Sequence, residues 1–157
     1  MNADGSRAQS AALLCNLGAG LCALPLDCVV ETMRPLPIKR ALGAPSFVLG
    51  LAVVRGQPIP VIDGARLINV GQTLAPKRFV ILKVGERRAA LAVDGVVGLR
   101  DLGQLPLAPL PPLLDGAETS AVAAIGALDR QLLTVLAGAR SIPPSAWPAV
   151  EKAGGPA

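Results

Sequence analysis

Short apolar segments alternate with glycine, proline and charged turn residues along almost the whole chain. The segments are rich in Leu, Val, Ile and Ala and are too short for typical helices, which favours buried β-strands. Where only a few turn residues separate two segments, we predict a hairpin, because a tight turn brings antiparallel strands together. The predicted strands cover residues 13–17, 21–26, 51–55, 58–63, 78–84, 88–93, 96–102, 121–128 and 131–137.

Short helices are predicted between some of these strands. Asp27 can cap the N-terminus of a helix over residues 28–33, and a helical turn is expected over residues 64–69. The proline-rich stretch 105–116 predicts an extended connector. The pattern as a whole predicts an all-β protein with short helices.

Two blocks of sequence recur once each, in the same order. Residues 13–30 align with residues 80–97, 67 positions further on, and residues 54–68 align with residues 128–142, 74 positions further on. The shared order favours a duplicated β unit, although chance similarity in a chain rich in Ala, Leu and Val is the alternative. Identical pairs include Gly18/Gly85, Ala23/Ala90, Asp27/Asp94, Gln57/Gln131 and Arg66/Arg140.

A duplicated unit of about five strands predicts two small β-barrel lobes packed together, because closing a sheet removes edges that would otherwise aggregate. The junction of two barrels forms a groove, which is suited to binding. We expect the boundary between the lobes near residues 70–78. Residues 1–10 and 148–157 are expected to be flexible tails.

Composition narrows the functional classes. The chain is 52% hydrophobic but only 2% aromatic, so its core must be aliphatic. Its 15 Lys and Arg residues outnumber its 11 Asp and Glu residues, which keeps a basic small-barrel nucleic-acid-binding protein as an alternative. The basic residues are scattered, however, and few aromatic residues are available to stack on bases. A small-molecule-binding module is a further alternative, supported only by the predicted groove.

The sequence contains no histidine, which removes Ser-His and Cys-His catalysis as well as histidine metal sites. It also lacks a phosphate-binding P-loop motif. The three cysteines, Cys15, Cys22 and Cys28, lack a fourth ligand and are expected to be small buried hydrophobic residues. We therefore expect no enzyme, no catalytic residue, no cofactor and no metal.

No apolar run reaches the roughly 18–20 residues that a membrane-spanning helix needs. The first ten residues do not have the basic and apolar regions of a signal peptide. We expect a cytoplasmic protein without direct membrane insertion.

The predicted hairpin of residues 51–63 has an arginine and a glycine at its turn. Gly56 can supply the positive φ that the turn requires. Arg55 can pair with Asp63, face solvent, or anchor an interface, where arginine is enriched. The repeat places Asp129 at the position equivalent to Arg55, so the turn itself does not require an arginine. This favours a functional role for Arg55.

Other residues near the turn have structural interpretations. Pro58 and Pro60 lack the N–H group that a strand donates, which predicts an edge strand or a nearby bulge. Asp63 and Asp94 each close an apolar run and are predicted to cap the turn that follows.

Three motifs occur in a fixed order: A-L-P-L-D-x-V-x-E at 23–31, P-x-x-V-L-G-L-x-x-x-R-G-x-x-x-P-V-x-D at 45–63, and A-L-A-V-D-x-V at 90–96. Together they resemble the CheW-like domain of bacterial chemosensory adaptors. The resemblance implies a single such domain over residues 11–142, made of two interleaved SH3-like, five-stranded β-barrels. It also implies a non-enzymatic scaffold that couples methyl-accepting chemoreceptors to a CheA-type histidine kinase, at membrane-associated receptor arrays.

The resemblance further implies a protein-binding surface. Its parts are the predicted short helix and the first-lobe hairpin, which would face the cytoplasmic tip of the receptor. The kinase would be bound through its regulatory domain. The residues assigned to protein binding are Val29, Glu31, Gly50, Val53, Val54, Arg55 and Gly56.

One position departs from the family pattern. The family usually has asparagine two residues before the arginine, where this chain has Val53. A polar side chain there could fix the turn, so its loss can change the local geometry of Arg55. The departure leaves open a specialised adaptor of a pilus or surface-sensing pathway.

Overall fold

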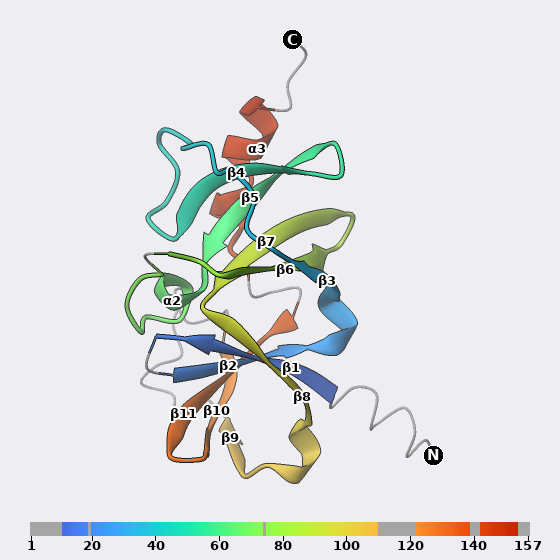
Figure 1. The fold of residues 1–157 in the computed structure, drawn as a ribbon, viewed down its shortest axis with the longest axis vertical. Helices are drawn as coiled ribbons and strands as arrows, with labels where there is room; N and C mark the ends of the chain where they lie inside the picture. The colour runs from blue at the N-terminus through green and yellow to red at the C-terminus, as the bar shows by residue number, and fades with distance from the viewer. Residues whose placement is uncertain (1–10, 19, 74, 110–121, 139–141, 154–157) are drawn as a thin grey trace.

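The computed structural model describes residues 11–18, 20–73, 75–109, 122–138 and 142–153. They form two mostly antiparallel β-sheets, one in the upper and one in the lower half of Figure 1. The upper sheet contains β3 (Val29–Met33), β4 (Val48–Val54), β5 (Gln57–Asp63), β6 (Arg78–Val84) and β7 (Arg87–Val93). The lower sheet contains β1 (Ala11–Leu17), β2 (Gly20–Pro25), β8 (Gly95–Asp101), β9 (Leu107–Pro109), β10 (Val122–Leu128) and β11 (Gln131–Leu136).

Helices are few and short in this part of the chain. The two α-helices are α2 (Gly64–Leu67) and α3 (Pro148–Ala153). Three 3₁₀ turns are η1 (Leu26–Cys28), η2 (Leu102–Gln104) and η6 (Pro144–Ala146). The prediction of an all-β protein with short helices is confirmed, as is the helical turn after Asp63.

The two sheets exchange strands between the halves of the chain. The upper order is β3-β6-β7-β5-β4, and the lower order is β8-β1-β2-β11-β10-β9. In the repeat, the strands β1, β2, β3, β4 and β5 correspond to β6, β7, β8, β10 and β11. Exchanging every strand for its counterpart converts the upper order into the first five strands of the lower order. The loop between α2 and β6, at residues 68–77, therefore separates the two copies along the sequence, while both sheets contain strands from both copies.

Irregularities recur at equivalent positions and support the duplication. The ladder between β3 and β6 skips Val30, and the ladder between β8 and β1 skips Val97, which lies 67 positions later. Likewise Leu49 is skipped in β4 and Ala123 in β10, 74 positions apart. Chance similarity of composition does not place β-bulges in register, so the predicted duplicated unit is real.

The core has three layers, because the strands of two hairpins are buried on both faces. On β6, Val80 and Leu82 face the core between the lobes, whereas Phe79 and Ile81 face the core of the upper lobe. The hairpin of β1 and β2 behaves in the same way, with Leu14 in the core of the lower lobe. Burial on both faces explains why these segments read as continuous apolar runs. The cysteines Cys15, Cys22 and Cys28 are free thiols in the core between the lobes.

The predicted helix over residues 28–33 is wrong. Residues Val29–Met33 form strand β3, whose side chains alternate between half-buried and exposed, and η1 occupies the preceding residues. The Asp27 side chain makes no cap hydrogen bond to that turn. Two valines and a threonine among five residues favour an extended backbone, and pairing with β6 satisfies its hydrogen bonds.

Strand β5 lies inside its sheet, between β4 and β7, but its two prolines occupy the half that has only one neighbour. Its pairing with β7 begins at Val61, whereas Pro58 and Pro60 face only β4. Val54 and Gln57 form the hydrogen-bonded pair next to the two-residue turn. Hydrogen-bonded and non-hydrogen-bonded pairs alternate along an antiparallel ladder, so Pro58 and Pro60 fall at positions whose nitrogen donates no hydrogen bond to β4. The predicted edge character therefore applies to this half of β5 only.

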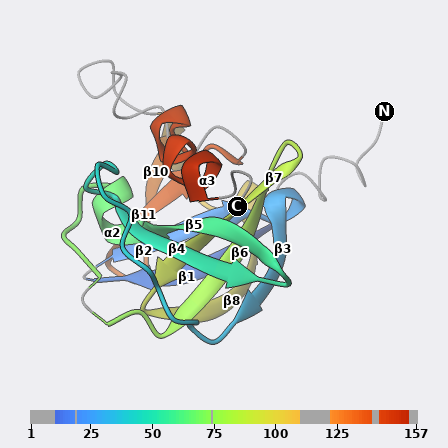
Figure 2. The same ribbon diagram turned by 90° about the horizontal axis from the view of Figure 1, so that it is seen from above.

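The C-terminal region differs from the predicted tail. Helix α3 lies beside β5, as Figures 1 and 2 show. Trp147, which precedes it, is buried in the core between the lobes, and the Arg87 guanidinium lies 5.1 Å from the centre of its ring. Arg87 also pairs with Glu151 on α3 at 3.1 Å. Of the predicted connector 105–116, residues 107–109 form β9 and residues 110–116 lie outside the described part of the chain.

Candidate partner-binding surface

The clearest polar feature of the upper lobe is an ion pair between Arg55 and Glu31. Nε of Arg55 donates to Oε2 of Glu31 at 2.8 Å, and Nη2 donates to Oε1 at 2.7 Å. Such a two-pronged geometry fits the planar guanidinium to the carboxylate and fixes both side chains. The sequence singled out both residues separately, and the structure brings them together. Arg55 does not pair with Asp63.

The pair joins the two outer strands of the upper sheet. Glu31 lies in β3 at one edge, and Arg55 lies in the turn that follows β4 at the other edge. Because this contact links the first and last strands of the order, it helps to close the sheet into a barrel. The Arg55 side chain is 68% exposed and the Glu31 side chain 24% exposed, so the closure also presents a charged surface.

The turn geometry directs Arg55 toward β3. Arg55 has φ = 50° and Gly56 has φ = 82°, two consecutive left-handed residues in a two-residue hairpin loop. This is the pattern of a type I′ turn, which matches the twist of the strands it connects. Gly56 therefore has the positive φ predicted from the sequence. The equivalent turn of the second copy, at Asp129 (φ 50°) and Arg130 (φ 68°), has the same form.

Electrostatics reinforce the pair. The hydrogen bonds from Arg55 hold the pKa of Glu31 below its usual range, with a further contribution from the charges of Arg55 and Arg88. The same contact raises the pKa of Arg55 above its usual value. Both groups are therefore charged at neutral pH.

Gly50 is buried beside the connector that precedes β4. A Cβ built at Gly50 would overlap the carbonyl oxygen of Lys39, and the backbone has φ = 151° there. The close approach lets Lys39 and Leu51 exchange two backbone hydrogen bonds of 2.8 and 2.7 Å. Gly50 thus shapes the base of the hairpin and does not itself form an accessible contact.

The three valines assigned to protein binding lie in different environments. Val53 is 65% exposed on the hairpin, next to the turn. Val29 is half-buried against the core between the lobes, and Val54 is 5% exposed inside the upper lobe. Of the three, only Val53 offers a large accessible surface, while Val54 supports the hairpin from within.

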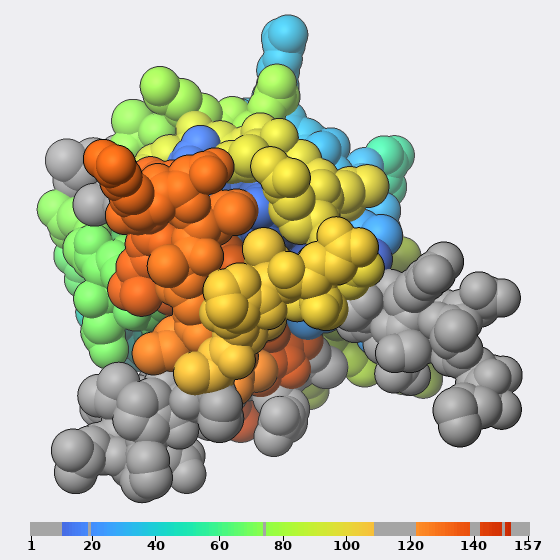
Figure 3. All heavy atoms as spheres, turned by 90° about the horizontal axis from the view of Figure 1, so that it is seen from below, coloured from blue at the N-terminus to red at the C-terminus, as the bar shows by residue number. Residues whose placement is uncertain are grey.

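Sequence reasoning missed an exposed apolar strand. Val96, Val97 and Leu99 of β8 are 37%, 50% and 62% exposed, and Val30 at the equivalent bulge of β3 is 38% exposed. Strand β8 is an edge strand whose ladder partner is β1. Figure 3 shows the part of the lower lobe built by β8, η2 and β9 next to β10 and β11. The run Val96-Val97-Gly98-Leu99 has the pattern of a strand buried on both faces, so no local signal in the sequence indicated this exposure.

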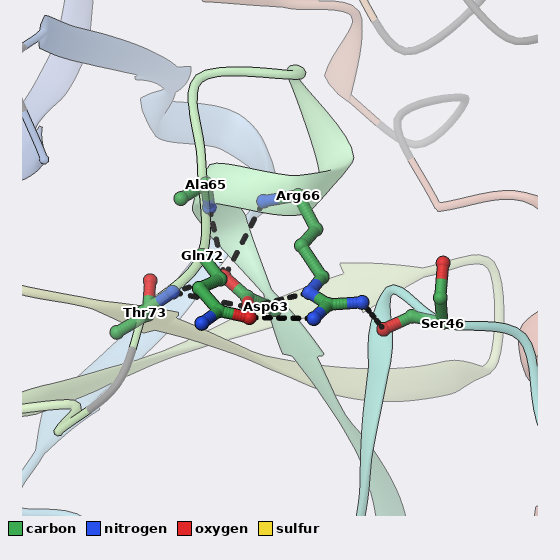
Figure 4. Close-up of polar contacts among 6 residues, drawn as sticks. All are labelled: Ser46, Asp63, Ala65, Arg66, Gln72 and Thr73. Carbon is green, nitrogen blue, oxygen red and sulfur yellow. Dashed lines mark hydrogen bonds and ion pairs between the residues drawn. The ribbon is translucent and has the colours of Figure 1, made fainter.

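Asp63 organises a second polar cluster, shown in Figure 4. Its Oδ1 accepts hydrogen bonds from the backbone N–H groups of Ala65, Arg66 and Thr73, and the residue is 1% exposed. Arg66 contacts Asp63 at 3.6 Å and donates to Oε1 of Gln72 at 2.6 Å. A carboxylate so fully engaged with the backbone has a structural role, which agrees with the predicted cap.

Asp94 acts differently from the cap predicted for it. Its Oδ2 accepts a hydrogen bond of 2.6 Å from the N–H group of Gly18, in the turn between β1 and β2. The contact ties the end of β7 to the other sheet, because the Asp94 N–H also donates to the Asn16 carbonyl. It stabilises the junction of the two lobes.

The described residues contain no group of three or more His, Cys, Asp or Glu side chains placed to hold a metal ion. Burial, more than the nearby Asp27 charge, raises the pKa of the Cys28 thiol to about 11, and its Sγ donates to the carbonyl of Pro25. A thiol with this pKa is a poor nucleophile at neutral pH. Across the same residues, no helix has the length and apolar character to cross a membrane.

The chain is similar to known proteins in sequence and in fold. Protein FrzA of Myxococcus xanthus is 32% identical over 96 residues, which cover 59% of this chain and 58% of FrzA. The crystal structure of the scaffolding protein TtCheW from Thermoanaerobacter tengcongensis matches with a TM-score of 0.68 and 25% identity, over 82% of this chain and 88% of that chain. This likeness confirms the predicted pair of SH3-like lobes. The model of the CheW-like domain matches residues 11–142, and the chain therefore belongs to the CheW-like domain family.

Proposed function

We propose that this chain is a non-enzymatic adaptor that couples the cytoplasmic tips of methyl-accepting chemoreceptors to the regulatory domain of a CheA-type histidine kinase. The observation that carries the proposal is the exposed surface formed by the Arg55–Gly56 turn and strand β3, held in one geometry by the ion pair with Glu31. Membership of the CheW-like family supports a scaffold function. The place of action would be the cytoplasm, at membrane-associated receptor arrays.

The surface has the composition of a protein-binding site. Arg55, Gly56 and Val53 are exposed on the hairpin, and Glu31 joins them from β3. Val29 packs half-buried against the core between the lobes, so a partner would contact only its exposed part. An arginine beside exposed aliphatic side chains is typical of residues that contribute strongly to binding. Gly50 and Val54 would act indirectly, by shaping and supporting the hairpin.

Val53 favours a specialised partner. Its side chain is 65% exposed at a position directly beside the turn, where the sequence departs from the family pattern. An exposed valine there offers an apolar contact instead of a hydrogen bond. A receptor of a pilus or surface-sensing pathway is therefore the second candidate partner within the same class.

The variant Arg55→Glu tests the proposal directly. Two carboxylates would then face each other in place of the ion pair, and we expect binding of the receptor fragment to weaken about tenfold or more, as for a central interface arginine. Kinase activation in a reconstituted receptor, adaptor and kinase mixture should fall with it. Isothermal titration calorimetry and kinase phosphorylation assays measure the two effects.

Two further variants distinguish a direct contact between Arg55 and the partner from an indirect role of the ion pair in shaping the hairpin. Arg130→Glu makes the same charge change in the equivalent turn of the other copy and should leave binding within about twofold of wild type, since it lies outside the proposed surface. The exchange Arg55→Glu with Glu31→Arg restores an ion pair but reverses its direction. If binding returns in this double variant, the pair only shapes the hairpin. Unchanged binding and kinase output in Arg55→Glu alone would contradict the role assigned to this residue.

A further inference from the structure

An open hollow of about 650 Å³ lies beside α2, between the connector that precedes β4 and the loop that follows α2. Its volume is in the range of sites that bind small molecules. Figures 1 and 2 show α2 on the side of the molecule away from β3, whose Glu31 holds the Arg55 turn. The hollow is therefore separate from the proposed partner-binding surface.

The hollow is lined by a residue whose buried hydroxyl group the fold does not use. Thr73 is 5% exposed, and its Oγ1 has no hydrogen-bond partner among the residues that the structure describes. Its backbone N–H donates to Oδ1 of Asp63 at 3.0 Å, which fixes the residue in place. Buried hydroxyl groups almost always have a partner. Because this one loses no hydrogen bond when it turns about χ1, it can rotate toward a bound ligand.

Two arginines line the hollow from different segments. Arg66 of α2 donates to Oε1 of Gln72 at 2.6 Å and to the Ser46 carbonyl at 3.4 Å, and its Nε lies 3.6 Å from the Asp63 carboxylate, as Figure 4 shows. These contacts fix the guanidinium while engaging three of its five N–H groups. Arg40, from the connector, takes part in none of the ion pairs found between described residues.

The balance of charge favours a ligand with one negative charge. Arg40 and Arg66 contribute two positive charges to the lining and Asp63 one negative charge, which leaves one positive charge without a counterion. A carboxylate matches this excess and can accept two parallel hydrogen bonds from a guanidinium. A phosphate dianion would exceed it and be repelled by Asp63. A cation would be repelled by both arginines.

The remaining lining includes an apolar wall. Val48 and Leu49, at the start of β4, and Ala44 and Pro45, in the connector, lie beside the polar groups. Val48 is 9% exposed and the other three are half-buried. An apolar wall with a few polar groups is typical of sites for small organic ligands. It favours a ligand with an aliphatic part over an inorganic ion.

We propose that this hollow binds a small organic monocarboxylate. Its carboxylate would lie between Arg40 and Arg66 and accept a hydrogen bond from the Thr73 hydroxyl group, while its aliphatic part packs against Val48 and Leu49. The site gives the chain a binding property beyond the proposed adaptor function, and the inference does not depend on that function.

The test follows amide signals of the ¹⁵N-labelled full chain by NMR during titration with sodium butyrate at constant ionic strength. Thr73→Val removes the unpartnered hydroxyl group and keeps the shape of the side chain, so this variant should be at least as stable as wild type. Arg40→Gln removes one cation of the lining. Arg78→Gln makes the same change at an exposed arginine outside the hollow.

We expect butyrate to cause saturable shifts of the Arg66 and Thr73 amide signals in wild type. Its affinity should fall about tenfold in Thr73→Val and in Arg40→Gln, because each loses a hydrogen bond to a charged group. Arg78→Gln should stay within about twofold of wild type. Acetate should bind at least roughly threefold more weakly than butyrate, since it buries fewer methylene groups.

Three further results would overturn the inference. Equal affinity for butyrate and for the uncharged butyramide would show that the site does not recognise a carboxylate. Tighter binding of inorganic phosphate than of butyrate would show that the head group is wrong. An affinity unchanged in both Thr73→Val and Arg40→Gln would place the ligand elsewhere. The absence of saturable shifts up to roughly 10 mM butyrate contradicts the inference as well.

Discussion

Arg55 occupies a backbone conformation that usually belongs to glycine or asparagine. Its φ of 50° costs about 1 kcal/mol for a residue with a side chain, and Asp129 has the same φ in the second copy. The type I′ turn therefore sets the conformation, and the side chain is free to vary between copies. In the first copy that side chain reaches across the lobe to Glu31, which makes one residue both a turn former and a link between sheet edges.

Gly50→Ala should destabilise the protein by roughly 2–3 kcal/mol, because its Cβ would overlap the Lys39 carbonyl in a left-handed region of the backbone. The two backbone hydrogen bonds between Lys39 and Leu51 would lengthen or break. Urea unfolding followed by circular dichroism measures the loss.

Gly43→Ala is the matched control for this change. Gly43 has φ = 79°, and no atom lies within 4 Å of a Cβ built there, so only the backbone cost of about 1 kcal/mol applies. Equal losses in the two variants would show that the contact with Lys39 does not restrict position 50.

Among the structural elements, α2 depends on a single side chain. Asp63 ends β5, accepts from the first N–H groups of the helix, and also holds the N–H group of Thr73 from the following loop. One buried carboxylate thus fixes a strand end, a helix start and a loop in the same place.

Asp63→Ala should lower the free energy of unfolding by about 3 kcal/mol, because several buried N–H groups lose their acceptor. Asp27→Ala is a suitable comparison. Asp27 is exposed and its side chain makes no cap hydrogen bond to η1, so a loss of no more than about 0.5 kcal/mol is expected. If the two substitutions cost the same in urea unfolding, the cluster around Asp63 is weaker than its burial indicates.

The hairpins were predictable from sequence because a hairpin is specified by turn residues between two apolar runs, which are close together along the chain. Gly18, Gly56 and Gly85 lie in two-residue turns between apolar runs, and each turn appears where it was expected. Strand β3 was not predictable in this way. A helix and a strand over Val29–Met33 differ mainly in whether β6, about fifty residues later, supplies a pairing partner.

The site residues show the same limit. Motif resemblance named Glu31 and Arg55, but their contact depends on sheet closure, which no local pattern contains. The exposed valines of β8 were missed because a strand edge and a buried strand have similar composition.

At the scale of the whole molecule, the core between the lobes is the feature that unites the chain. The hairpins β1–β2 and β6–β7 each bury one face there and the other face in a lobe. Separating the halves of the sequence would expose both apolar faces and leave every sheet incomplete. We expect residues 11–142 to fold as one unit for this reason.

Cutting the chain between Pro76 and Lys77 tests this expectation. Fragments 1–76 and 77–157 should each fail to unfold cooperatively when alone, because neither contains a complete sheet. Mixed at equal concentration, they should regain the circular dichroism spectrum and cooperative unfolding of the intact chain, with a midpoint that rises with concentration. Dispersed amide signals from either isolated fragment in an NMR spectrum would contradict it.

The reciprocal exchange of strands also bears on how such a protein can arise. Two identical copies of one five-strand unit, each giving its first hairpin to the other, would close the same pair of sheets as a domain-swapped homodimer. Joining the copies through a loop such as residues 68–77 converts that association into an intramolecular one, independent of concentration. Once joined, the halves are free to diverge, and Arg55 in one turn with Asp129 in the other is the result: a symmetric scaffold with two unlike ends.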